Sequence, residues 1–222
     1  MKYIYLSHVL GSDTPSYGNK DKYFIRLNSS IKNGDSSNTS SWFFSNNHIG
    51  THIDVPFHFC ISGKKTSDYS IEDFIFNKIE VIDINCEEAI LIDSNYIKKH
   101  KINSEVELLI IRTGYEKYRG TDKYWNDNPG LSSELGNYFR SNFPKLRCIG
   151  FDFISLTSWK FREEGRKSHK EFLCPDNKKN EILIIEDMKL SVISENKLTQ
   201  VIVVPVITED GNGGPVTVIA SI

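Results

Sequence analysis

Three histidines and one aspartate fall within eleven residues of this chain, and the clustering of their side chains suggests metal chemistry. The segment reads His48-Ile-Gly-Thr-His52-Ile-Asp54-Val-Pro-Phe-His58, with the polar groups at even positions. A period of two is typical of an extended segment, whose imidazoles and carboxylate share one face while apolar residues anchor the other. Such groups repel one another when protonated and lose hydration when neutral, so a bound cation explains the cluster better than packing does.

The length of this segment indicates that it bends. In a straight strand His48 and Asp54 would lie roughly 20 Å apart at ~3.3 Å per residue, too far to share one ion through bonds of ~2 Å. The segment therefore bends or serves two ions. Gly50 and Pro56 are the expected bends, because glycine tolerates unusual backbone angles and proline fixes its own. Imidazole and carboxylate ligands suit Zn²⁺ or another first-row ion such as Mn²⁺ or Fe²⁺.

The elements that position these residues are those of an α/β domain. A length of 222 residues fits one hydrophobic core, so we expect a single domain over residues 1–222. Short apolar runs alternate with helical patterns, which favours a mixed α/β fold. Strands are predicted at Tyr3–Leu6, Trp42–Phe44, Lys78–Ile84, Leu108–Arg112, Arg147–Phe153, Ile182–Glu186, Val201–Ile207 and Val216–Ala220. Helices are predicted to begin near Ser70, Ser94 and Ser132, and a fourth to cover Glu163–Phe172.

Two polar stretches, Asn28–Ser40 and Asp122–Gly130, are predicted to be loops. The first is long enough for two interpretations, a lid over a neighbouring site or a mobile surface excursion. The four cysteines lie far apart and include no C-x-x-C pair, so we expect reduced, mostly buried thiols rather than a disulfide framework. They are Cys60, Cys86, Cys148 and Cys174.

Composition and missing motifs exclude several classes of protein. Lys and Arg number 27 against 29 Asp and Glu, which argues against a nucleic-acid partner. The N-terminus lacks the features of a secretory signal, and no run approaches the ~18 apolar residues of a membrane span, so we expect a cytoplasmic protein without a membrane partner. The chain has no G-x-S-x-G elbow and no G-x-x-x-x-G-K loop, which disfavours a serine hydrolase and a phosphate-transferring enzyme.

From His48 to Phe59 the sequence matches H-x-G-T-H-x-D-x-P-x-H-F at every fixed position. In this motif the chain resembles the cyclase-like metal-dependent hydrolase family, which includes bacterial kynurenine formamidases and isatin hydrolases. Shorter matches extend the likeness along the chain, at Leu6-Ser7-His8, Arg112-Thr113-Gly114, Gly150-Phe151-Asp152 and Gly213-Gly214-Pro215-Val216. The resemblance implies a single domain with a mixed or barrel-like sheet and flanking helices.

The resemblance also implies roles for individual residues. It makes His48, His52 and Asp54 metal ligands and gives His58 a catalytic role. Two further ligands, His169 and Glu186, are carried over from a family pattern in which a His followed by apolar residues precedes a strand ending in Glu. The chain departs from the family at Ser155-Leu156-Thr157, where relatives often carry Ser-x-Asp, which leaves the substrate open.

The chemistry expected of such a site is hydrolysis of a small-molecule substrate. A divalent ion, most simply Zn²⁺ with Mn²⁺ as the alternative and one or two per subunit, would lower the pKa of bound water towards ~7. His58 would take the water proton and deliver it to the leaving nitrogen of an amide or formamide. Two alternatives remain open: cyclisation or dehydration of a polyketide-like substrate, and a non-catalytic metal-binding protein. The resemblance further implies a homo-oligomer, most simply a dimer.

Overall fold

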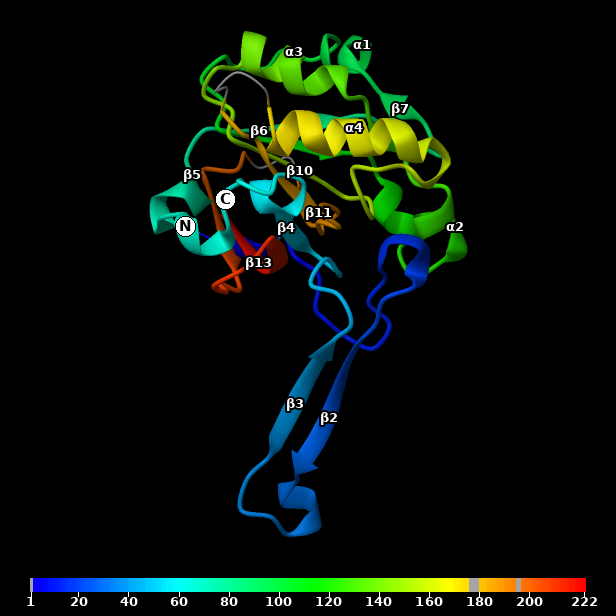
Figure 1. The fold of residues 1–222 in the computed structure, drawn as a ribbon, viewed down its shortest axis with the longest axis vertical. Helices are drawn as coiled ribbons and strands as arrows, with labels where there is room; N and C mark the ends of the chain where they lie inside the picture. Colours follow the sequence, from blue (N-terminus) through cyan, green and yellow to red (C-terminus); the bar gives the residue numbers. More distant parts are fainter. Residues whose placement is uncertain (1, 176–179, 195–196) are drawn as a thin grey trace.

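The fold is seen in a computed structural model that describes residues 2–175, 180–194 and 197–222 (Figure 1). Its strands are β1 (Tyr3–Tyr5), β2 (Tyr23–Ser29), β3 (Thr39–Phe44), β4 (His52–Asp54), β5 (Ile75–Phe76), β6 (Ile79–Asp83), β7 (Leu91–Ile92), β8 (Leu108–Arg112), β9 (Gly130–Leu131), β10 (Cys148–Phe151), β11 (Leu183–Glu186), β12 (Gln200–Pro205) and β13 (Gly213–Ser221). Its α-helices are α1 (Ser94–Ile97), α2 (Asp122–Asn126), α3 (Glu134–Asn142) and α4 (Arg162–Leu173). The 3₁₀ turns used below are η1 (Tyr17–Asn19), η3 (Pro56–His58), η5 (Ile71–Phe74) and η7 (Trp159–Phe161).

One nine-stranded mixed sheet forms the centre of the molecule. Its order is β5-β12-β13-β4-β11-β10-β8-β6, with β1 paired to β13 beside this path. The strands β6, β8, β10 and β11 run parallel to their neighbours within that group, whereas β4 pairs antiparallel with both β11 and β13. The expectation of an α/β fold with a mixed, barrel-like sheet is confirmed.

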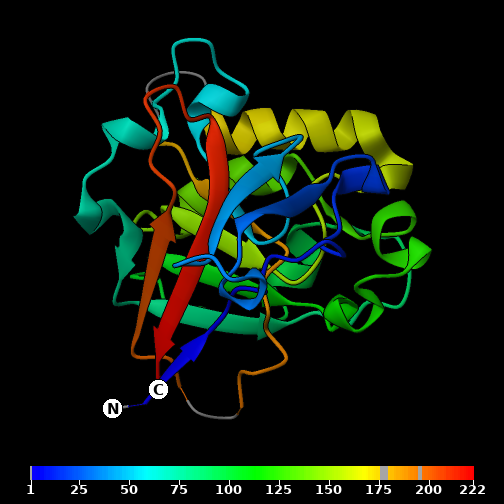
Figure 2. The same ribbon diagram turned by 90° about the horizontal axis from the view of Figure 1, so that it is seen from below.

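Alternate residues of the central strands face two different hydrophobic cores. In β8, Leu109 and Ile111 pack against α3 and α4 in one core, whereas Leu108 and Ile110 belong to the other. The second core also contains side chains of β5, β12 and β13, so the sheet curls round and encloses it. This separation is what the period-two geometry of a strand requires when both of its faces are buried. Figure 2 shows the curled sheet from below, with α4 on one side of it.

The predicted loops and one predicted helix differ from the structure. The Asn28–Ser40 stretch is the far end of a two-stranded hairpin, β2–β3, which projects away from the body (Figure 1). Residues 23–44 do not line the pocket described below, so the lid interpretation stays a prediction. The Asp122–Gly130 stretch contains α2, because Tyr124 and Trp125 are buried there and fix a helical turn. The helix expected from Ser70 is only the short turn η5.

The cysteines also differ from expectation. Cys60 and Cys174 form a disulfide across a sequence separation of 114 residues. They are neighbours because the turn after η3 packs against the C-terminal end of α4, a proximity that sequence spacing does not reveal. Cys86 and Cys148 are buried free thiols, as expected. Within the described part of the chain, no helix has the length and apolar character needed to cross a membrane.

Candidate metal centre

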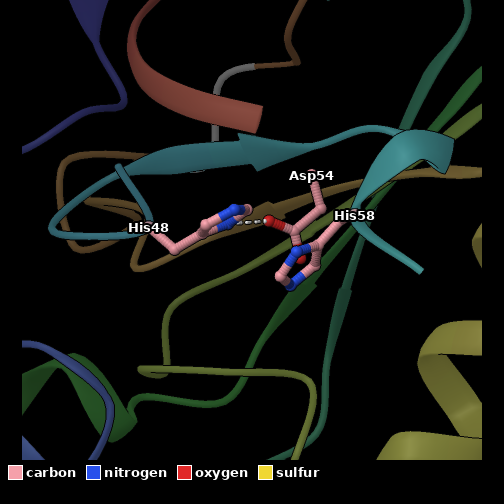
Figure 3. A group of neighbouring side chains, drawn as sticks. All are labelled: His48, Asp54 and His58. Carbon is pink, nitrogen blue, oxygen red and sulfur yellow. Dashed lines mark hydrogen bonds and ion pairs between the residues drawn. The ribbon is translucent and has the colours of Figure 1, made fainter. Parts of the chain in front are cut away.

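Two bends bring the histidines and the aspartate of the motif together. Gly50 has a φ of +66°, and a Cβ at this position would lie 2.9 Å from side-chain atoms of Leu10 and Thr14, so both conformation and space favour glycine. Beyond β4, Pro56 starts the turn η3, which carries His58 back towards the same point. Figure 3 shows the result: His48 reaches the Asp54 carboxylate, and the His58 ring lies beside it. The Nδ1 of His48 is 2.7 Å from Oδ1 of Asp54.

The register of β4 against β11 places Glu186 opposite His52. Directly opposed residues of antiparallel strands have side chains on the same face of a sheet. The His52 Nε2 therefore lies 3.3 Å from Oε2 of Glu186 and 3.5 Å from Oδ1 of Asp54. Asp187, the next residue, points away from this cluster, and its carboxylate accepts hydrogen bonds from Arg119 and Tyr124.

The helix α4 contributes His169 to the same cluster. Gly165, one turn earlier, allows the helix to approach closely, since a Cβ there would lie 2.4 Å from Oγ1 of Thr157. The His169 ring stacks on Phe59 with 4.7 Å between centroids. Its Nε2 is 3.5 Å from both a carboxylate oxygen of Asp54 and one of Glu186.

The hydrogen bonds of these two imidazoles leave their Nε2 atoms suited to a cation. The Nδ1–H of His52 donates to the Gly50 carbonyl at 2.8 Å, and that of His169 donates to the Gly165 carbonyl at 2.9 Å. In a neutral imidazole the Nε2 atom then carries a lone pair. Both lone pairs face carboxylate oxygens, which are also acceptors, so a proton or a cation is required between them. Such backbone anchoring is typical of histidine metal ligands.

The pKa values indicate the same need for positive charge. Burial alone would lower the pKa of His52, but the carboxylates of Glu186 and Asp54 outweigh it and raise that pKa to about 9. They likewise raise the pKa of His169 to about 10 against the effect of burial. Although burial raises the pKa of Asp54, the charges of His48 and His169 hold it well below its usual range.

Two groups of side chains have the geometry to bind an ion, and they share Asp54. One consists of His52, Asp54 and Glu186, all buried; the other consists of His48, Asp54 and His58. In each group the potential ligand atoms lie within 4.8 Å of one another. The structure thus brings together all six residues singled out in the sequence. His58, for which the sequence predicts a catalytic role, is also close enough to His48 and Asp54 to be a metal ligand.

His58 lies in the pocket with its ring stacked on that of His48, the centroids 4.0 Å apart. Burial lowers the pKa of His58 to about 4, and the nearby Asp54 carboxylate offsets this only in part. The ring is therefore neutral near pH 7, with a lone pair available to accept a proton.

Several supporting residues were missed in the sequence. Asn212 accepts a hydrogen bond from Nε2 of His48 at 2.9 Å and so fixes the orientation of the ring whose Nδ1 lies 2.7 Å from Oδ1 of Asp54. The backbone N–H of Leu156 and the hydroxyl of Ser155 donate to Oε1 of Glu186 and fix its orientation. In the sequence, Ser155 and Leu156 stand out only as a departure from the family pattern. The Gly213-Gly214 pair was the one signal near Asn212: a Cβ on Gly213 would lie 2.7 Å from the His48 ring.

A pocket of about 260 Å³ opens over the cluster. Besides the six residues, its walls include Pro15, Ser16, Tyr17, Asp21, Asn46, Gly50, Phe59, Ile154, Ser155, Thr157, Arg162 and Arg166. The pocket combines buried titratable groups with aromatic and apolar walls, as is typical of an active site.

Comparison with known proteins finds relatives along the whole chain. The profile of a family described as "Putative cyclase" matches residues 4–157. A kynurenine formamidase from Bacillus anthracis is 25% identical over 215 residues, which cover 97% of this chain and 95% of the relative.

Solved structures give the same picture of the fold. An isatin hydrolase bound to the product analogue thioisatinate superimposes with a TM-score of 0.79 at 20% identity, over 99% of this chain and 91% of that one. A potential metal-dependent hydrolase with cyclase activity superimposes with a TM-score of 0.74 at 17% identity, over 99% and 96% of the two chains.

Proposed function

This chain belongs to the putative cyclase family, and we propose that it is a metal-dependent hydrolase that cleaves the carbon–nitrogen bond of an aryl formamide or a cyclic amide. The observation that carries the proposal is the orientation of His52 and His169, whose Nδ1 atoms are fixed by backbone carbonyls while their Nε2 atoms face two carboxylates. The kynurenine formamidase and isatin hydrolase relatives support the choice of bond.

The residues present fit a divalent cation. His52, Asp54, His169 and Glu186 would hold it, and His48 beside Asp54 would contribute to the same ion or to a second one. Imidazoles with carboxylates favour Zn²⁺, and Mn²⁺ is the alternative. A cation bound there would lower the pKa of a water ligand towards ~7 and polarise the substrate carbonyl.

The remaining steps belong to the side chains of the pocket. The neutral His58 accepts a proton from the attacking water as the oxygen of that water bonds to the carbonyl carbon. It then donates that proton to the leaving nitrogen as the carbon–nitrogen bond breaks, which yields an amine and a carboxylic acid. Phe59 and Ile154 line the pocket and give these transfers apolar surroundings.

A reconstitution experiment tests the proposal. Protein stripped with a chelator is expected to lose turnover of N-formylkynurenine and isatin and to regain it with Zn²⁺ or Mn²⁺. His52→Ala should bind less metal than the wild type, because it removes an anchored ligand. His100→Ala, which substitutes a histidine outside the pocket, is the matched control. Wild-type protein that retains metal but hydrolyses neither substrate would contradict hydrolysis of these amides and favour a cyclase or dehydratase.

We further propose that the protein forms a homodimer. The hairpin β2–β3 is a two-stranded sheet of its own, and such a ribbon is marginally stable in isolation. It exposes six large apolar side chains: Phe24, Ile25, Leu27, Ile31, Trp42 and Phe44. An exposed apolar patch of this kind favours an interface, and a second copy of the chain is the partner we propose.

A further inference from the structure

One face of α4 carries two arginines in line with the candidate metal ligand His169. Arg162, Arg166 and His169 are spaced by four and three residues, so they follow one another along the same face of the helix. All three line the pocket above the metal cluster. The helix therefore presents two guanidinium groups at the opening of a site whose floor holds Asp54 and Glu186.

These two arginines lack the partners that other arginines of the chain have. Arg112 and Arg119 each form a two-pronged ion pair with an aspartate, at distances of 2.6 to 3.0 Å. Across the described residues, neither Arg162 nor Arg166 has a carboxylate oxygen within ion-pair distance. Like charges four residues apart on a helix repel each other and are mildly destabilising. An anion bound between the two guanidinium groups would reduce this repulsion.

The acidic groups of the pocket wall already have other partners. Asp21 lines the pocket, but its carboxylate accepts hydrogen bonds from Asn46 at 3.1 Å and Ser45 at 3.2 Å. Asp54 and Glu186 are surrounded by the site imidazoles. The positive charge of the two guanidinium groups is therefore available to a ligand.

The Arg162 side chain is held in place by aromatic neighbours. Its guanidinium lies over the Trp159 ring, 4.8 Å from the centroid, and that ring packs against Tyr17 with centroids 5.0 Å apart. Gly18 allows this packing, since a Cβ there would lie 2.6 Å from the indole. The Tyr17 hydroxyl is buried and has no hydrogen-bond partner of normal geometry in the described structure, although the Arg162 charge acts on it.

We propose that Arg162 and Arg166 bind a carboxylate of the substrate, with the Tyr17 hydroxyl as an additional donor, so that the enzyme selects anionic aryl amides or formamides. Guanidinium groups match carboxylates in both charge and planar geometry. A pocket of about 260 Å³ favours a single aromatic ring. This inference rests on the proposed hydrolase function and adds its substrate class.

A pair of substrates that differ only in the carboxylate tests the inference. N-formylanthranilate carries one beside the formamide, and formanilide does not. We expect wild-type kcat/KM to favour the anionic substrate, and Arg162→Gln/Arg166→Gln to lower that preference by roughly 10–100-fold, the range for lost hydrogen bonds to a charged group. The loss should fall mainly on KM. Lys170→Gln, which removes one charge from an exposed position of α4 outside the pocket, is the control.

A binding measurement separates this inference from the proposed function. Calorimetry with anthranilate should show binding to the wild type and weaker binding to the double variant, whether or not either formamide is hydrolysed. If both substrates turn over and the double variant keeps the wild-type preference, the arginines do not select the anion. If neither formamide turns over, turnover of N-formylkynurenine and isatin decides the hydrolase proposal, and anthranilate binding decides the anion site: binding that is equal in wild type and double variant overturns that site.

Discussion

At the scale of single residues, Asp54 is the centre of the site. Its Oδ1 lies near His48 and His52, and its Oδ2 lies near His169. A carboxylate that faces imidazoles on both sides can bridge two cation positions, which explains why both candidate ligand groups include it. His58 belongs to only one of these groups, and the other group can hold an ion without it. An experiment can therefore separate a catalytic role of His58 from metal binding.

His58→Ala is expected to lower turnover by about 10²–10⁴-fold while metal content stays at the wild-type value, because general acid–base assistance has this magnitude. The measurement is elemental analysis and kinetics on the same preparation, with His100→Ala as the control. A variant that loses metal and regains full turnover on reconstitution would instead make His58 a ligand, in keeping with its place beside His48 and Asp54.

Tyr124→Phe is expected to lower the free energy of unfolding by about 1–3 kcal/mol, because the buried Asp187 carboxylate loses a donor. Chemical denaturation measures this change. Tyr5→Phe, which removes the hydroxyl of an exposed tyrosine, should change stability by no more than about 0.5 kcal/mol.

The same variant has a defined pH dependence. Burial and the charge of Asp187 raise the pKa of Tyr124 well above its usual range, so the folded protein keeps this proton. The unfolded chain loses it above a pH of ~10, and wild-type stability therefore falls there by up to ~1.4 kcal/mol per pH unit from this residue. Denaturation between pH 9 and pH 11 should show a shallower fall for Tyr124→Phe. Parallel curves would show that Tyr124 does not hold its proton on folding.

At the scale of elements, the apolar patterns of the sequence predict the strands and helices whose burial they reflect. The apolar run of β8 was predicted with its observed bounds, and α4 within one residue at each end, because each pattern reports burial directly. The bend at Gly50 followed from the length of the segment. Of the hairpin only the Trp42–Phe44 part of β3 was predicted, and β2 was missed, because the two strands pair only with each other and expose their apolar residues. The contact of Asn212 with His48 spans 164 residues, and no local pattern encodes it.

The disulfide is the element-scale feature with the largest expected effect on stability. Cys60→Ser/Cys174→Ser should lower the free energy of unfolding by about 2–5 kcal/mol, since the bond closes a loop across 114 residues. A reducing agent should destabilise the wild type similarly and leave the double variant unchanged.

Alkylation of the unfolded, unreduced protein provides a direct check. Only Cys86 and Cys148 should react. Reaction of all four cysteines would show that the pair is reduced, as is usual in a cytosol and as the expected cytoplasmic location would require.

At the scale of the whole molecule, the hairpin makes the shape asymmetric: a body that contains the site and an arm that extends from it (Figure 1). We expect light scattering at micromolar concentration to give the mass of a dimer. Phe24→Ser/Trp42→Ser should shift the protein towards monomer, because each substitution removes an exposed apolar side chain from the arm. Ile207→Ser, equally exposed but outside the hairpin, is the control. A wild-type monomer would contradict the dimer.

The position of β4 between β11 and β13 has a consequence for biosynthesis. A ribosome releases residues 48–58 long before the β11 residues that pair with β4, and residues 213–215, which pair with β4 on its other side, follow later still. A nascent chain thus displays His48, His52 and Asp54 as a flexible, incomplete chelator. The full set of candidate ligands comes together only after α4 has brought His169 and β11 has paired with β4, which brings Glu186. We therefore expect a cation at this site to be selected by the metal supply after β11 has paired with β4, and not while the motif is being translated.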